Sequence, residues 1–151
     1  MRVGLLSDTH DRVPAVRALL EQMVAGGVSL VMHAGDYCSP FSLQPFHDLS
    51  LPLLGVFGRN DGDRDALQAA AKLGFGALEL YESPHSFEIG GKNVLLIHDL
   101  ADVHQRSIDG QASRKFPSAI GLAVSSPPCR VRSRFFMWSK DFRFTVSREL
   151  D

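Results

Sequence analysis

Four short polar clusters follow directly on apolar runs in this chain. The clusters are Asp8-Thr9-His10, Gly35-Asp36, Gly58-Arg59-Asn60-Asp61 and Ile97-His98-Asp99. They contain carboxylates, imidazoles and an amide, which supply oxygen and nitrogen atoms of the kind that bind Mn²⁺, Fe, Zn²⁺ or Ni²⁺. Such ions can activate water for hydrolysis. The pattern therefore predicts a metal site assembled from segments that are far apart in the chain.

Each cluster alone is weak evidence for a metal. An Asp-x-His pair such as Asp8 and His10 often makes only local hydrogen bonds, and Gly35-Asp36 is an ordinary turn pair. A single histidine after a strand, like His98, is more often a hydrogen-bonded residue at the rim of a sheet. The combination favours a metal site, because every cluster follows a predicted strand.

The same sequence also predicts the strands and helices that carry these clusters. The apolar runs indicate buried strands at 3–6, 28–32, 53–57 and 94–97. Between them we expect a helix from about Pro14 to Gly26-Gly27, a short helix over 40–48 and a helix over 63–73. Strand–helix alternation with short connections predicts an α/β fold with a largely parallel sheet. Ligands bind beyond the carboxyl ends of the strands in such a sheet.

The pattern is weaker after about residue 103. The remaining predicted elements are strands at 77–81 and 85–89, a hairpin turn at Gly90-Gly91, a strand at 119–124 and a hairpin over 134–146. Residues 104–118 are polar and carry no helical stripe. Because about 48 residues with few aliphatic side chains cannot readily form a separate core, we expect a single domain over 1–151 with an atypical C-terminal part.

Length and charge limit the class of protein. With 151 residues the chain fits one domain, and its formal net charge of -1 gives no global field for steering a polyanion. Residues 1–103 hold 7 Lys/Arg and 13 Asp/Glu, whereas residues 104–151 hold 9 and 4. The acidic part carries the candidate ligands, which suits the binding of a cation.

Cysteine usage and hydropathy bear on location. Cys38 and Cys129 are far apart and form no zinc-binding pattern. The chain opens with a strand and shows no basic leader or apolar signal segment. No apolar stretch approaches the ~20 residues that span a bilayer. We expect a cytoplasmic protein that does not enter a membrane.

Taken together, the motifs resemble those of the calcineurin-like metallophosphoesterase superfamily. The resemblance rests on Ser7-Asp8-Thr9-His10, Gly35-Asp36, the turn from Gly58 to Asp61, and His98, and it covers about residues 1–103. Within this superfamily, the chain resembles the small YfcE-like phosphodiesterases. The resemblance implies a layered α/β sandwich, with a mostly parallel sheet carrying helices on its faces. It also implies hydrolysis of a phosphodiester or phosphomonoester in a small phosphorylated substrate.

The resemblance further implies a dinuclear site and a ligand for each position. Two divalent ions, Mn²⁺ first and Ni²⁺, Zn²⁺ or Fe as alternatives, would share Asp36. Asp8 and His10 would complete the shell of one ion. His98 and an asparagine from the Gly58 turn would bind the other.

Two features of this chain differ from the family pattern. The family asparagine directly follows the glycine, but here Arg59 occupies that position and Asn60 comes next. Arginine stays protonated and cannot bind a cation. Either Asn60 takes the ligand role through a shifted turn, which we favour slightly, or Arg59 binds substrate phosphate. A plain Asn-Asp-Gly turn would also explain the residues that follow Arg59.

The second difference is the absence of the family Gly-His-x-His motif after His98; the only later histidine is His104. Each ion would lose one ligand, so we expect weaker metal binding and low or absent turnover. The alternative function is therefore a catalytically inactive member of the family that acts as a protein-interaction scaffold.

We expect several other residues to have structural roles. Cys38 is expected to be a small buried hydrophobe and His33 to pack or hydrogen-bond in the core. Three arginines near the C-terminus occupy alternate positions, as on one face of a strand, and aromatic residues follow them. Because the aromatics lie next to the arginines, we expect a half-buried strand and not a nucleic-acid surface. These residues are Arg130, Arg132, Arg134, Phe135, Phe136 and Trp138. If the same aromatics are exposed, they offer a contact surface for a homo-oligomer.

Overall fold

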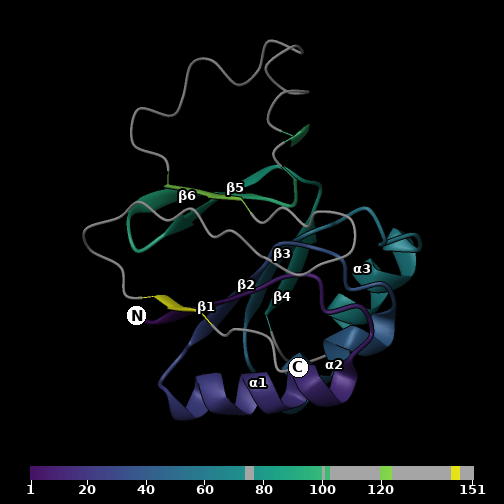
Figure 1. Cartoon of the computed structure of the whole chain (residues 1–151), viewed down its shortest axis with the longest axis horizontal. Coiled ribbons are helices and arrows are strands. Elements are labelled where there is room, and N and C mark those ends of the chain that lie inside the picture. The colour runs from purple at the N-terminus through teal and green to yellow at the C-terminus, as the bar shows by residue number, and fades with distance from the viewer. Residues whose placement is uncertain (74–76, 100, 103–119, 124–143, 147–151) are drawn as a thin grey trace.

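The computed structural model describes residues 1–73, 77–99, 101–102, 120–123 and 144–146 (Figure 1). Strands and helices alternate through the first half of the chain, as the apolar runs predicted. The elements are β1 (Val3–Leu6), α1 (Val13–Ala25), β2 (Leu30–His33), the 3₁₀ helix η1 (Pro40–Leu43), α2 (Gln44–Asp48), β3 (Leu53–Val56), α3 (Arg64–Lys72), β4 (Leu78–Tyr81), β5 (His85–Ile89), β6 (Lys92–Ile97), β7 (Ile120–Ala123) and β8 (Phe144–Val146).

The central sheet is parallel throughout, in the strand order β4-β3-β2-β1-β8. Leu6 pairs with His33 at the end of β1 and β2, and His33 pairs with Gly55 near the end of β3. The register therefore brings the carboxyl ends of these three strands to one edge of the sheet. This arrangement confirms the predicted α/β class and places the polar clusters after β1, β2 and β3 side by side.

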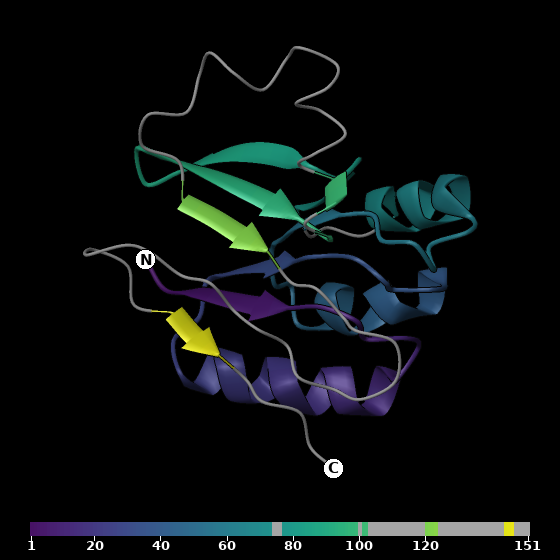
Figure 2. The same ribbon diagram turned by 45° about the horizontal axis from the view of Figure 1, so that its top comes forward.

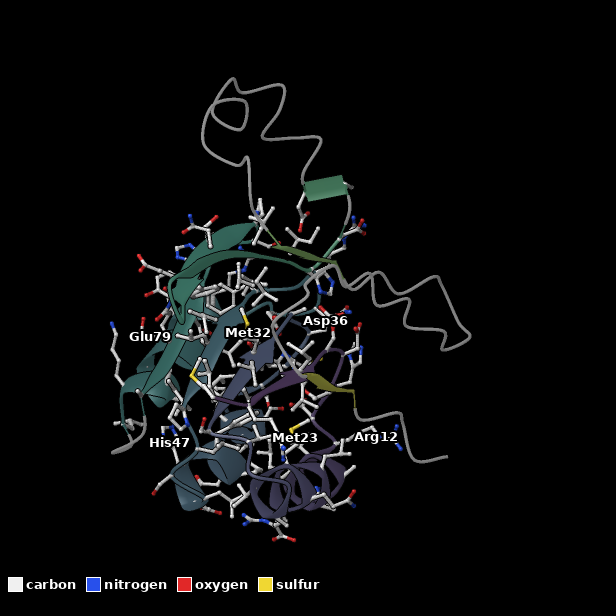
Figure 3. All side chains as sticks on the ribbon, turned by 90° about the vertical axis from the view of Figure 1, so that its left-hand side faces the viewer. Arg12, Met23, Met32, Asp36, His47 and Glu79 are labelled. Carbon is white, nitrogen blue, oxygen red and sulfur yellow. The ribbon has the colours of Figure 1, made fainter. Side chains whose placement is uncertain are left out.

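The two faces of the central sheet are covered by different elements (Figure 2). Helices α1, α2 and α3 pack on one face, where Leu20 and Leu67 are fully buried in a shared core. The other face packs against a second sheet of β5, β6 and β7, and Met32 and Phe87 are both buried in that second core. Figure 3 shows Met32 in the interior between the layers and Met23 on the inner side of helix α1. The fold is a three-layer sandwich.

The place of β6 corrects one sequence-based expectation. We expected the strand before His98 to end at the edge of the same sheet as the other three. Instead, β6 pairs antiparallel with β5, with Ser86 opposite Leu95, and belongs to the second sheet. The tight turn at Gly90 and Gly91, both with positive φ, favours this local pairing. The end of β6 still delivers His98 to the site.

Local chemistry sets the element boundaries. Helix α1 has Pro14 in its first turn and buries Val16, Leu20 and Met23 at helical spacing. Helix α3 begins after Asp63, whose side chain accepts a hydrogen bond from the Ala66 N–H. Strand β2 starts two residues later than predicted, because the N–H of Val28 bonds the Met23 carbonyl at the end of α1.

Predictions for the C-terminal part are tested only in fragments. The strand expected at 119–124 is present as β7, and residues 144–146 form β8 beside β1. The predictions for 104–118 and for the remainder of the hairpin over 134–146 lie outside the described residues. None of the helices that the structure describes is long and apolar enough to cross a membrane.

Candidate metal centre

The loops after β1 and β2 continue the pairing of those strands through their backbones. The N–H of Asp8 donates to the Gly35 carbonyl at 3.0 Å, and the N–H of His10 donates to the Asp36 carbonyl at 3.0 Å. These bonds fix the two loops against each other. The spacing of the three candidate ligands Asp8, His10 and Asp36 is therefore set by the main chain.

The same two loops hold an unusual concentration of left-handed backbone. Asp8, His10, Asp11, Asp36 and Cys38 have φ values of 55°, 42°, 57°, 62° and 75°. Asp and His tolerate this region better than most residues, but each instance still costs of order 1 kcal/mol or more. Strain of this kind persists where the surrounding structure holds it in place, and it is common at ligand-binding sites.

Three side chains from these loops converge on one point. The Nε2 atom of His10 lies 3.8 Å from Asp8 Oδ1 and 3.6 Å from Asp36 Oδ2. One donor atom from each of the three residues falls within 4.8 Å of the others. Asp36 is buried, Asp8 is half-buried and His10 is exposed, so the cluster is open to solvent on one side.

His98 approaches Asp36 from the second sheet. Its Nδ1 lies 2.7 Å from the Ala34 carbonyl, which can only accept, so Nδ1 carries a proton. The neutral ring then has a lone pair on Nε2, which lies 3.6 Å from Asp36 Oδ1. This is how metal-binding histidines are commonly oriented, with the second ring nitrogen donating to a carbonyl. The two oxygens of Asp36 thus face two different imidazoles.

The donor set fits divalent metal ions. Ligand atoms about 2.1 Å from a shared ion are separated from one another by roughly 3 to 4 Å, and the separations of 3.6–3.8 Å around Asp36 match this range. They are too long for hydrogen bonds between the same groups. Asp8, His10 and Asp36 would hold one ion, and His98 with Asp36 would contribute to a second.

Asn60 lies against the shared carboxylate. Its backbone N–H donates to Asp36 Oδ1 at 2.9 Å and its side-chain amide donates to Oδ2 at 2.7 Å. Burial alone would raise the pKa of Asp36, but these two bonds, with His98 and His10 nearby, lower that pKa below its ordinary value. The shifted turn thus brings Asn60 to the site. Its role as a metal ligand, which needs the amide oxygen, stays a prediction.

Arg59 points to a different partner. Its guanidinium Nη2 lies 2.6 Å from Asp99 Oδ2, and its side chain is 65% exposed. Asp99 follows His98, so the ion pair joins the loop after β3 to the loop after β6. Binding of a substrate phosphate by Arg59 stays a prediction.

Asp61 belongs to the third polar cluster, but the sequence assigned it no role of its own, and the structure shows that it connects the loops of the site. It is 2% exposed, and its carboxylate accepts the N–H groups of Asp36 at 3.0 Å, Cys38 at 2.8 Å and Gly58 at 2.7 Å. Three backbone donors hold this buried carboxylate. It therefore ties the loop after β2 to the loop after β3.

Close approach of the same loops requires two glycines. A Cβ on Gly35, which has a φ of 99°, would lie 2.5 Å from the backbone nitrogen of Gly58. A Cβ on Gly58 would overlap the carboxylate and the backbone nitrogen of Asp36. Only glycine at both positions lets the two main chains meet at this distance.

Two residues behind the ligands test earlier expectations. His33 is fully buried and bonds Thr9 and Gly35, which confirms its expected place in the core. Burial, followed by the charge of His98, lowers the pKa of His33 to about 3. Cys38 is not buried as expected: it is half-buried, with its Sγ 3.2 Å from Nδ1 of His10. Burial also raises the pKa of the Cys38 thiol to about 11.

Comparisons with known proteins bear on the family and the fold of this chain. Residues 1–119 match the model of the calcineurin-like phosphoesterase superfamily domain. Phosphodiesterase MJ0936 of Methanocaldococcus jannaschii is 37% identical over 68 residues, a match that covers 45% of this chain and 41% of that protein. The matched part thus spans about two fifths of the length of this relative.

Two solved structures extend the comparison. A novel archaeal phosphodiesterase superposes with a TM-score of 0.62 at 28% identity, covering 72% of this chain and 66% of the other. The phosphoesterase YfcE of E. coli gives a TM-score of 0.50 at 14% identity, covering 66% of this chain and 58% of the other, which supports the fold alone.

Proposed function

The chain belongs to the calcineurin-like phosphoesterase superfamily, and from this premise we propose that it hydrolyses a phosphoester in a small phosphorylated substrate at a dinuclear metal site. Enzymes of this family generally depend on divalent metal ions. We propose Mn²⁺ as the preferred ion, with Ni²⁺, Zn²⁺ or Fe as alternatives, because carboxylate and imidazole ligands accept all of them.

The single observation that carries the proposal is the position of Asp36 between two imidazoles. Its Oδ2 faces His10 and its Oδ1 faces His98, each at 3.6 Å from Nε2. A carboxylate in this position can bridge two cations. Its negative charge offsets part of the repulsion between them. When bound, such a pair of ions supplies a hydroxide near neutral pH and neutralises charge on the phosphoryl oxygens.

The residues of the chain have separate roles in this proposal. Asp8 and His10 would hold one ion in the open half of the site, where a substrate can enter. His98 would contribute to the second ion from the second sheet, and the two hydrogen bonds from Asn60 keep Asp36 ionised and oriented. Arg59 lies on the neighbouring loop, where its guanidinium can bind a phosphate in place of Asp99.

The missing Gly-His-x-His motif favours a second candidate. Residues 99–151 carry no such motif, so the residues in hand supply fewer ligands to each ion than the family pattern does. The second candidate function is an inactive member of the family that serves as a protein-interaction scaffold. Arg59 in the position of the family asparagine supports the same alternative. A folded chain that binds neither Mn²⁺ nor Zn²⁺ in calorimetry would favour the scaffold over the enzyme.

Hydrolysis of bis-p-nitrophenyl phosphate with Mn²⁺ tests the proposal, with p-nitrophenyl phosphate as the monoester probe. We expect release of p-nitrophenol by the wild-type chain and a fall to the buffer rate in Asp36→Asn. Asp48→Asn is the matched control, because Asp48 is an exposed aspartate on α2 paired with Arg17. A wild-type rate no higher than that of Asp36→Asn would exclude the hydrolase.

A further inference from the structure

His33 connects both ligand loops from beneath. Its Nδ1 accepts the N–H of Gly35 at 3.1 Å, directly before Asp36. Its Nε2 lies 3.1 Å from Oγ1 of Thr9, the residue between Asp8 and His10. The imidazole is fully buried, so neither bond competes with solvent.

The hydrogen bonds fix the tautomer of His33. A backbone N–H can only donate, so Nδ1 holds a lone pair and the proton sits on Nε2, which donates to Thr9. The ring stacks on Tyr37 with centroids 4.1 Å apart, and the Tyr37 hydroxyl donates to the His33 carbonyl at 3.3 Å. The ring is held on its face and at both nitrogens.

We propose that His33 is a positioning residue that sets the separation between the loop carrying Asp8 and His10 and the loop carrying Asp36. The His33 ring is hydrogen-bonded to both loops, so a shift of either loop breaks a buried hydrogen bond. The inference rests on the proposed metal site and deepens it, because it names what keeps the ligands at binding distance before an ion arrives. His33 contacts neither ion nor substrate and acts only through Thr9 and Gly35.

Four substitutions separate the two bonds. Asparagine places its amide oxygen near the position of Nδ1, so His33→Asn keeps the acceptor for Gly35 and loses the donor to Thr9. Glutamine reaches the position of Nε2, so His33→Gln keeps the donor and loses the acceptor. Thr9→Val removes the hydroxyl that accepts from Nε2 and conserves the shape of the side chain. Thr9→Ser keeps that hydroxyl and serves as its control.

Mn²⁺ affinity of the full chain, measured by calorimetry, is the main readout. We expect His33→Leu to weaken binding by about 10- to 100-fold, the range typical of groups that orient metal ligands, and the single-bond variants to lose less. Thr9→Val combined with His33→Asn should lose no more than either alone, because both remove the same bond. Thr9→Ser should bind like the wild type.

His47→Leu is the control matched to His33→Leu, because it removes a histidine hydrogen bond that lies away from the metal site. His47 lies on α2, where its Nε2 is 2.9 Å from the Ala70 carbonyl, and Figure 3 shows it well away from Asp36. It should lower the unfolding midpoint and leave Mn²⁺ affinity unchanged. If His33→Leu likewise changes only the midpoint, His33 is a core residue and the positioning role is wrong.

A second readout does not need a metal. The ¹⁵N shifts of the metal-free chain at pH 7 should assign the proton of His33 to Nε2, and Thr9→Val should shift the Nε2 signal. A proton on Nδ1 would overturn the inference whether or not metal binds. If the wild type binds no Mn²⁺ but shows the Nε2–H tautomer, the proposed function fails while the loop connection stands.

Discussion

The two halves of the site, which meet at Asp36, are built in different ways. Asp8 and His10 lie on a loop whose backbone is bonded to the loop of Asp36, so their spacing is fixed by peptide groups. His98 comes from another sheet and reaches Asp36 through one side chain and one bond to the Ala34 carbonyl. The first half is set by the main chain, and the second by side-chain packing.

This contrast indicates which half of the site can lose a ligand and still bind an ion. Three ligands on two paired loops form a preorganised group, so binding there requires little rearrangement. The half around His98 holds fewer ligands, and Arg59 stands where the family has an asparagine. We therefore expect one tightly bound ion and one weakly bound ion.

Gly58→Ala should abolish the contrast by disrupting both halves. The added Cβ overlaps the Asp36 carboxylate, so the loops after β2 and β3 must separate. We expect a loss of about 3 kcal/mol in the free energy of unfolding and no measurable Mn²⁺ binding. Urea unfolding and calorimetry measure the two effects. Gly62→Ala is the control, since a Cβ on Gly62 meets nothing within 4 Å; equal behaviour of the two variants would contradict the close approach.

His10→Ala and His98→Ala should separate the halves. Removing His10 leaves two ligands in the preorganised group, so the affinity of the tight ion should fall by at least about 100-fold. Removing His98 should eliminate the second equivalent of metal and leave the first within about threefold. Titration with Mn²⁺, followed by calorimetry or electron paramagnetic resonance, counts the ions. The same loss in both variants would mean that the halves are equivalent.

Acid should destabilise the protein through His33, which is hydrogen-bonded to the two loops of the preorganised half. The pKa of His33 is about 3 in the folded chain and 6.5 in the reference state, so the unfolded chain binds the additional proton between these values. Stability therefore falls as the pH falls from 6.5, by about 2 kcal/mol at pH 5. Below about pH 3.8, protonation of Asp36, whose pKa is lowered in the fold, adds to the loss.

Urea midpoints at several pH values check this prediction. In His33→Gln the urea midpoint should fall less between pH 6.5 and 5 than in the wild type, because glutamine does not titrate. His47→Gln, which leaves His33 in place, should show the same fall as the wild type. A wild-type midpoint that stays constant over this range would argue against a neutral, buried His33.

Arg59→Asn should strengthen the weak half and has the smallest expected effect. The substitution restores the family order of an asparagine after Gly58 and removes a positive charge from the neighbourhood of His98. We expect the second Mn²⁺ to bind several-fold more tightly. Loss of the exposed ion pair with Asp99 should change stability by under about 1 kcal/mol. Weaker binding of the second ion would indicate that Asn60 already fills the ligand role.

The strand-end clusters could be predicted because strand periodicity and residue type are local properties. Val3–Leu6 and Leu53–Val56 have no polar residue, and the polar side chains begin where these strands end. The α/β class and the meeting of Asp8, His10 and Asp36 follow from that pattern. His98 was also placed correctly at the site, although through the wrong sheet.

The supporting residues could not be predicted because their partners are peptide groups from other segments. Asp61 resembles any Asn-Asp-Gly turn in the sequence, and only the folded chain shows its carboxylate on three backbone N–H groups. The position of β6 depended on a competition between a local hairpin and a parallel partner, which alternation alone does not decide. The contact of Cys38 with His10 required two left-handed loops that no sequence rule predicts.

Continued pairing beyond β1 and β2 has a consequence for how this region can change. Surface loops usually accept inserted residues, because their main chain makes few hydrogen bonds to neighbouring segments. Here a single added residue between Leu6 and His10 would slip each peptide past its partner and turn the carboxylate of Asp8 to the opposite side. Natural variation in loop length should therefore be found elsewhere in the molecule. A recognition segment grafted by design should likewise avoid the loops after β1 and β2.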